Sequence, residues 1–139
     1  MITHISIWGV LVAALSALVV GSVWYARPLF GNSWMKGVGI SDKDMKEKFP
    51  TAMPMLIVVS LLTAYVLALF VKYFHAYHGG SWYKAGVLTA LLAWVGLAGT
   101  ALMAHEVFEK RPKKIVLINL GNRLVTLLVM GLIIAAFMS

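Results

Sequence analysis

Four long apolar runs divide this chain of 139 residues, at positions 5–26, 53–71, 85–104 and 115–138. Each has roughly the 17–25 residues that an α-helix needs to cross the hydrocarbon core of a bilayer. Backbone groups inside hydrocarbon must be hydrogen-bonded within their own segment, and these runs are far longer than the strands of a membrane barrel. The sequence therefore predicts an all-α, integral membrane bundle of four transmembrane helices.

The composition leaves no room for a separate soluble domain. Hydrophobic residues make up 61% of the chain and charged residues 12%, and the mean hydropathy is +0.88. Soluble domains carry about a quarter charged residues. We therefore expect one membrane domain over residues 1–139. The net charge of +7 is attributed to loops that face anionic membrane lipids, and nucleic acid is not expected as a partner.

The chain contains no cysteine, which excludes disulfides, thiolate nucleophiles and cysteine-bound metals. No glycine-rich phosphate loop and no Ser-His-Asp grouping is evident. The sequence thus predicts a protein that is not an enzyme and has no cofactor. Run 5–26 lacks a basic leading region and a convincing cleavage site, so we expect it to be a retained helix.

Basic residues are distributed unequally between the predicted loops. Loops 27–52 and 105–114 share one side of a four-span protein and hold nine Lys and Arg residues, against two in loop 72–84. The positive-inside rule then places both termini outside the cytoplasm. We expect a multi-pass protein of the bacterial inner (plasma) membrane.

The first loop carries two local patterns. Ser41 and Asp44 resemble a capping box that opens a short charged, amphipathic cytoplasmic helix through Lys48, which Pro50 should stop. Before it lies an interfacial aromatic motif, which is expected to anchor the protein at headgroup depth, with ligand binding as the alternative. Its members are Trp24, Tyr25, Phe30 and Trp34.

Small residues spaced by four occur on all four spans and predict close helix packing, within one chain or between protomers. They are Ala13/Ala17/Gly21, Ser60/Ala64/Ala68, Gly96/Thr100/Ala104 and Gly131/Ala135.

Several motifs together resemble a family of small bacterial four-helix inner-membrane proteins that is catalogued only as a domain of unknown function. The residues are Trp24-Tyr25, Pro28-Leu-Phe-Gly31, Trp34-Met-Lys36, Phe108-Glu-Lys-Arg-Pro112, Ile118-Asn119, Gly121 and Leu124-Val125. The resemblance covers nearly the whole chain and implies no activity, so no catalytic residue is transferred. The Asn122-Arg123 pair departs from the family pattern, where an aromatic followed by a less basic residue is expected.

The fourth run is broken by strongly polar side chains at i, i+3, i+4 and i+7, which share one face of a helix. These are Asn119, Asn122, Arg123 and Thr126. A polar stripe that faces lipid is costly, so we expect this face to point into the bundle or into another subunit. Glu106 is the preferred ion-pair partner of Arg123 and Glu109 the second choice. The alternative is an anion or lipid headgroup bound by Arg123.

Two histidine clusters are weak candidates for metal sites. His105 and Glu109 are spaced i, i+4 with Glu106 alongside, which is a two-ligand pattern. A second group, His4, His75 and His78, lies at the opposite side of the predicted bundle and could offer three imidazoles. Neither pattern is sufficient to predict a bound metal.

The leading interpretation is a non-catalytic integral membrane protein that acts as a homo-oligomer or as an accessory subunit of a larger membrane complex. The alternative is a small transporter or a lipid- or anion-binding membrane protein that uses the Asn119/Asn122/Arg123 face. Proton-coupled exporters need an acid within the membrane, and the five acids here fall in loops or at a helix end. If Glu106 and Tyr25 close off the polar stripe, a structural role is favoured; if the stripe lines an open cavity, binding is favoured.

Overall fold

The computed structural model describes residues 4–139, whose regular structure is all helical and contains no strand. Four helical stretches are long and apolar enough to cross a membrane. They are α1 (Ile7–Trp24), α3 (Asp42–His78), the continuous run of α4 (Trp82–Ala93), η2 (Trp94–Ala98) and α5 (Gly99–Phe108), and α6 (Lys113–Met138). The all-α fold and the four long apolar helices are confirmed.

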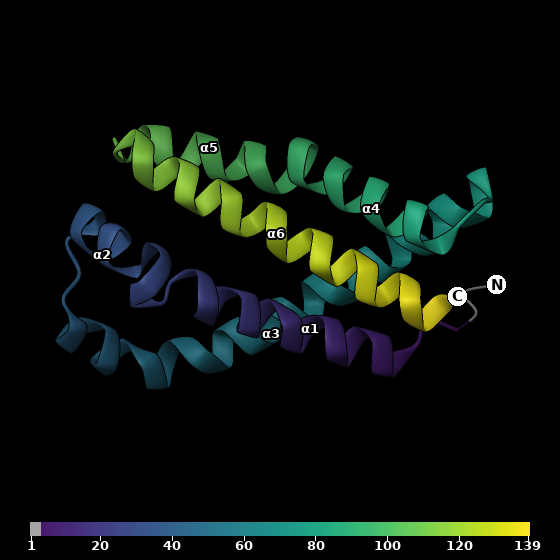
Figure 1. Cartoon of the computed structure of the whole chain (residues 1–139), viewed down its shortest axis with the longest axis horizontal. Helices are drawn as coiled ribbons and strands as arrows, with labels where there is room; N and C mark the ends of the chain where they lie inside the picture. The colour runs from purple at the N-terminus through teal and green to yellow at the C-terminus, as the bar shows by residue number, and fades with distance from the viewer. Residues whose placement is uncertain (1–3) are drawn as a thin grey trace.

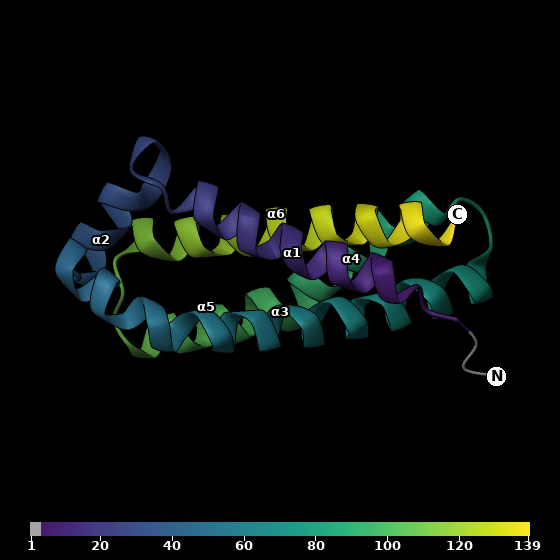
Figure 2. The same cartoon turned by 90° about the horizontal axis from the view of Figure 1, so that it is seen from below.

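The four stretches run antiparallel to their sequence neighbours (Figure 1). α6 packs against α1 and α4, and α3 packs against the same two helices from the other side. Figure 2 shows α1 and α6 in one layer and α3 and α5 in the other, with α4 crossing from α6 toward α5. We call the end with α2 (Asn32–Val38) and the α5–α6 turn the basic end, and the end where α1 starts and α6 finishes the terminal end (Figure 1).

The packed core lies toward the terminal end and is made largely of small side chains. Gly86 of α4 and Gly131 of α6 form its closest crossing, because a Cβ on Gly86 would lie 2.4 Å from the Gly131 carbonyl oxygen. Such contact between backbones is what holds helices together in lipid. Ala13, Ala64, Ala68 and Ala135 are fully buried around this crossing.

The predicted ridge of small residues on the third span does not pack within the chain, and packing between protomers stays a prediction. Gly96 and Thr100 are exposed, and a Cβ on Gly96 would meet nothing within 4 Å. Gly86 and Ala90, one turn apart on α4, contact α6 instead. The same spacing occurs at both places, and only the direction of the face distinguishes them.

The first loop contains the predicted capping box but not the predicted helix end. Asp44 N donates to Ser41 Oγ over 3.2 Å, and Ser41 N donates to Asp44 Oδ2 over 3.1 Å. The helix that begins there does not stop at Pro50; it continues through Pro54 to His78 as α3. The separate short helix of this loop is α2, which follows a kinked π-helical turn, η1 (Arg27–Gly31).

The bundle is open toward the basic end. Six successive residues of α3, 54–59, are all exposed, and six residues at 100° each cover every face of a helix. α3 has almost no contact with α5. Of α5 itself, Gly99 and Glu106 are the buried residues. The polar residues Asn119 and Arg123 of α6 lie at this end of the molecule, and Arg123 is exposed.

Candidate functional site

A chain of three side chains connects α1, α6 and α5 at the basic end. The Tyr25 hydroxyl donates a 2.7 Å hydrogen bond to Asn119 Oδ1, and Asn119 Nδ2 donates to Glu106 Oε1. Both ends of the Asn119 amide are therefore bonded to other helices. Such bonds stabilise helix association where the hydrophobic effect is absent.

A tryptophan next to this chain fixes its geometry. Trp24 Nε1 donates to the backbone carbonyl of Ile118 over 3.0 Å. Its ring lies against Gly121, where a Cβ would be 2.9 Å from the indole. Gly121 therefore has to lack a side chain for Trp24 to reach α6. This contact brings Tyr25 opposite Asn119.

Glu106 is a carboxyl group in the interior of the bundle, with 4% of the residue exposed. Its Oε2 atom is buried without a hydrogen-bond partner, and so is the Nδ2 atom of Asn122 one turn along α6 from Asn119. Buried polar atoms nearly always have partners, and the exceptions call for an explanation. Glu106 lies at a helix end, as expected, in the last turn of α5, but it is buried and not solvated.

Arg123 does not pair with Glu106. No carboxylate of residues 4–139 lies within 4 Å of its guanidinium, and Arg123 is exposed. On an ideal helix it lies about 100° from Asn122, so it is at the edge of the polar stripe, whereas Asn122 and Thr126 are buried. The stripe is divided: Asn119 is closed off by Tyr25 and Glu106, and Arg123 is open.

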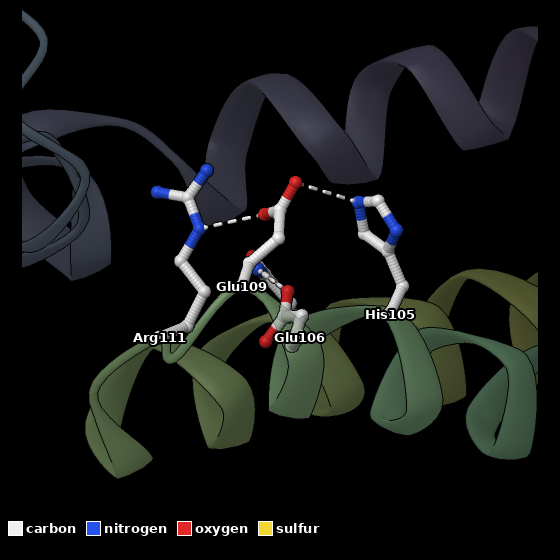
Figure 3. Close-up of polar contacts among 5 residues, drawn as sticks. His105, Glu106, Glu109 and Arg111 are labelled. Atoms are coloured by element: carbon white, nitrogen blue, oxygen red, sulfur yellow. Dashed lines mark hydrogen bonds and ion pairs between the residues drawn. The ribbon is translucent and has the colours of Figure 1, made fainter.

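Glu109, the second expected partner, is bonded elsewhere. Its carboxylate lies between the Arg111 guanidinium at 3.0 Å and the His105 ring at 3.1 Å, as Figure 3 shows. Glu106 takes no part in these contacts, because it is on the buried side of α5. The expected placement of His105 and Glu109 on one face is therefore confirmed, whereas Glu106, expected alongside, lies on the buried side of α5.

The histidines at the terminal end are held by local contacts. The His75 ring stacks on Trp82 with centroids 3.6 Å apart and bonds the Gly80 carbonyl at 2.9 Å. His78 stacks on Phe74. Within residues 4–139, no group of three or more His, Cys, Asp or Glu is placed to hold a metal, so His4, His75 and His78 do not form the three-imidazole cluster.

The aromatic motif of the first loop packs in two ring pairs. Trp24 and Phe30 have centroids 4.7 Å apart, and Tyr25 and Trp34 are 5.2 Å apart. All four residues are half-buried. The motif residues therefore pack on one another beside the contact of α1 with α6, and headgroup anchoring stays a prediction.

Nearly the whole chain matches a known protein family. Residues 8–135 match the family described as "Protein of unknown function (DUF1761)". The chain belongs to the DUF1761 family. The curated proteins and the solved structures include no match to it.

The structure brings together two motifs that are far apart in the sequence. Trp24 and Tyr25 from one motif contact Ile118, Asn119 and Gly121 from another, although 94 residues separate the hydrogen-bonded pairs. Gly31 completes the first motif, because a Cβ there would lie 2.4 Å from the Tyr25 carbonyl oxygen. These residues thus form one cluster at the basic end.

A further contact, between Trp94 and α6, was not predicted from the sequence. Trp94 Nε1 donates to the Leu120 carbonyl over 3.0 Å, at the start of the π-helical turn η2. α6 thus receives an indole N–H from α1 and another from the third span. A tryptophan in the middle of an apolar run is unusual, and that position was the available indication.

Proposed function

We propose that this chain is a non-catalytic integral membrane protein that acts as a homo-oligomer or as an accessory subunit of a larger membrane complex. The observation that supports this is the exposure of residues 54–59 on every face of α3. A helix in a complete bundle buries one face, as α3 does farther along at Ala64, Leu67, Ala68 and Val71. The open half provides room for a helix from another subunit.

The proposal places the protein in the bacterial inner membrane with both termini outside the cytoplasm and membrane lipids around it. It has no catalytic residue and no cofactor. The Tyr25–Asn119–Glu106 chain supports a structural role, because the two hydrogen bonds of the Asn119 amide join three helices.

Site-specific photo-crosslinking tests this proposal in native membranes. A benzophenone amino acid replaces Val58 in the open half of α3, or Val19 on α1 as the matched control; both valines are about equally exposed, at 55% and 54%. We expect a protein adduct from position 58 and mainly lipid adducts from position 19. An adduct with twice the mass of the chain indicates a homo-oligomer. An adduct of any other mass indicates a different partner protein and therefore an accessory role. Lipid adducts alone from both positions would refute the proposal.

A second candidate function, lipid or anion binding or transport, is favoured by Arg123. It is an exposed cation on a membrane-spanning helix without a carboxylate partner among the described residues. Such residues mark ligand pathways more often than they serve packing.

A further inference from the structure

Arg123 lies on a face of α6 that is buried elsewhere along the helix. Met130 and Ile134 are 7 and 11 residues farther on, which places them within about 20° of Arg123 on an ideal helix. They are 0% and 2% exposed, whereas Arg123 is exposed. The same stripe therefore changes from packed to open between the middle of α6 and the basic end.

Arg123 lies deep in the apolar part of α6, so its guanidinium needs a partner. Arg123 is ten residues beyond Lys113, the first residue of α6, which corresponds to about 15 Å along the helix. Half of a typical hydrocarbon core is about 15 Å. A cation at this depth is costly unless it extends toward the headgroups or meets an anion.

Four of the five acids are bonded to other groups. Asp42 pairs with Arg27, Glu109 with Arg111 and His105, and Glu106 accepts from Asn119. Asp44 is bonded to Ser41. The fifth acid, Glu47, forms no ion pair with Arg123. No carboxylate of residues 4–139 therefore neutralises Arg123 at contact distance, which leaves the site open to an anion from the surroundings.

The surroundings are those of a lipid and not of a soluble anion. Residues 54–59 of α3 present apolar side chains, and Met103 and Val107 of α5 are 48% and 66% exposed. Lys110, Lys113 and Lys114 lie at the rim of the same end. Hydrocarbon walls below a basic rim match a molecule with an anionic head and acyl tails.

We propose that Arg123 binds the headgroup phosphate of an anionic phospholipid whose acyl chains lie against the exposed apolar faces of α3 and α5. A guanidinium suits this role because its planar N–H groups can hold two phosphate oxygens at once. This inference rests on the second candidate function, in which lipid and not a subunit helix covers residues 54–59 of α3, and it specifies the ligand class for that site.

The experiment is native mass spectrometry of the full chain, released from detergent with phosphatidylglycerol or phosphatidylcholine as the added lipid. We expect the wild type to retain phosphatidylglycerol preferentially. Arg123→Gln should weaken that retention about tenfold, and Arg123→Lys by an intermediate amount because an ammonium is a point charge. Lys114→Gln is the matched control, since it removes one charge from the same end of the same helix and should have a smaller effect.

Other outcomes overturn the proposal. Equal retention by wild type and Arg123→Gln shows that Arg123 holds no lipid. Displacement of phosphatidylglycerol by inorganic phosphate in the same sample shows a soluble-anion site instead. The melting temperature of Arg123→Gln should match the wild type, because no internal partner is lost. Subunit mass is read from the same spectra, so failure of the oligomer proposal is seen separately from failure of the lipid site.

Discussion

Asn119 determines how the polar residues of α6 are used. Its carbonyl accepts from Tyr25 and its amide donates to Glu106, so one side chain joins three helices. The sequence predicted that this face turns inward. It also predicted that Glu106 has a partner on this face, but the expected partner was Arg123 and not Asn119. An amide and a guanidinium one turn apart cannot be ranked from spacing alone, because a rotation of about 40° decides which reaches the carboxyl group.

Two double-mutant cycles test this assignment. Glu106→Leu and Asn119→Leu should be coupled by about 0.5–3 kcal/mol, because each single change leaves the other buried polar group without its partner. Glu106→Leu and Arg123→Leu should be additive to within about 0.5 kcal/mol. Unfolding free energies in detergent provide the measurement. Equal coupling in both cycles would restore the Arg123 pairing.

Asp44 gives a pH dependence at the start of α3, outside the apolar runs. Hydrogen bonds from the Ser41 backbone and hydroxyl lower the pKa of the Asp44 carboxyl, with a further contribution from Lys48. A lowered pKa in the folded state means that the cap stabilises the helix above the ordinary Asp value and is lost as pH falls through the lowered pKa. We expect the protection of amides near Asp44, measured as exchange relative to the intrinsic rate at each pH, to fall in acid.

The matched variant for that measurement is Asp44→Asn, which keeps an oxygen acceptor but does not titrate in this range. Asp42 is present in both proteins, so the difference between their pH profiles isolates Asp44. Identical profiles would show that the capping carboxylate contributes nothing to the order of this helix end.

At the scale of elements, the sequence predicted the long helices better than their ends. Pro50 was expected to stop a helix because proline lacks an N–H and costs about 3 kcal/mol in a helix interior. α3 passes through Pro50 and Pro54 all the same. A chain entering hydrocarbon has to keep its backbone groups bonded internally, so helix on both sides of a proline is favoured over a loop. The π-helical turn η2 was not predicted either, because its residues continue the apolar run without a change in pattern.

Packing faces were the part of each element that spacing could not assign. Gly86→Ala should destabilise the protein by about 1–3 kcal/mol, because its Cβ would lie 2.4 Å from the Gly131 carbonyl oxygen and push the two backbones apart. Gly96→Ala should be neutral or stabilising by about 0.4–1 kcal/mol, since open space surrounds it and alanine favours the helix. Thermal unfolding in detergent compares them. Similar losses in both variants would contradict this packing.

At the scale of the whole molecule, hydropathy predicted four spans and their up-and-down order but not the opening toward the basic end. Hydropathy measures transfer into an apolar phase, and lipid and protein interior are equally apolar. Residues 54–59 therefore resemble a packed span in sequence, although no residue of the described part, 4–139, covers them. The motif residues that converge at the basic end were identified, whereas their contacts depend on helix rotation.

Orientation is the prediction that concerns the whole molecule. Nine Lys and Arg residues lie in the two loops at the basic end and two in the loop at the other end. Because positive loops are retained on the cytoplasmic side, a reporter that fluoresces only in the cytoplasm should be bright when fused after Lys46 and dark when fused after Ser139. A periplasm-specific phosphatase at the same two positions should give the reciprocal pattern, which separates orientation from poor expression. Bright Ser139 fusions with dark Lys46 fusions would reverse the topology and would place Arg123 against the outer leaflet. In the predicted orientation, Arg123 faces the inner leaflet, and the proposed anionic phospholipid has to come from that leaflet.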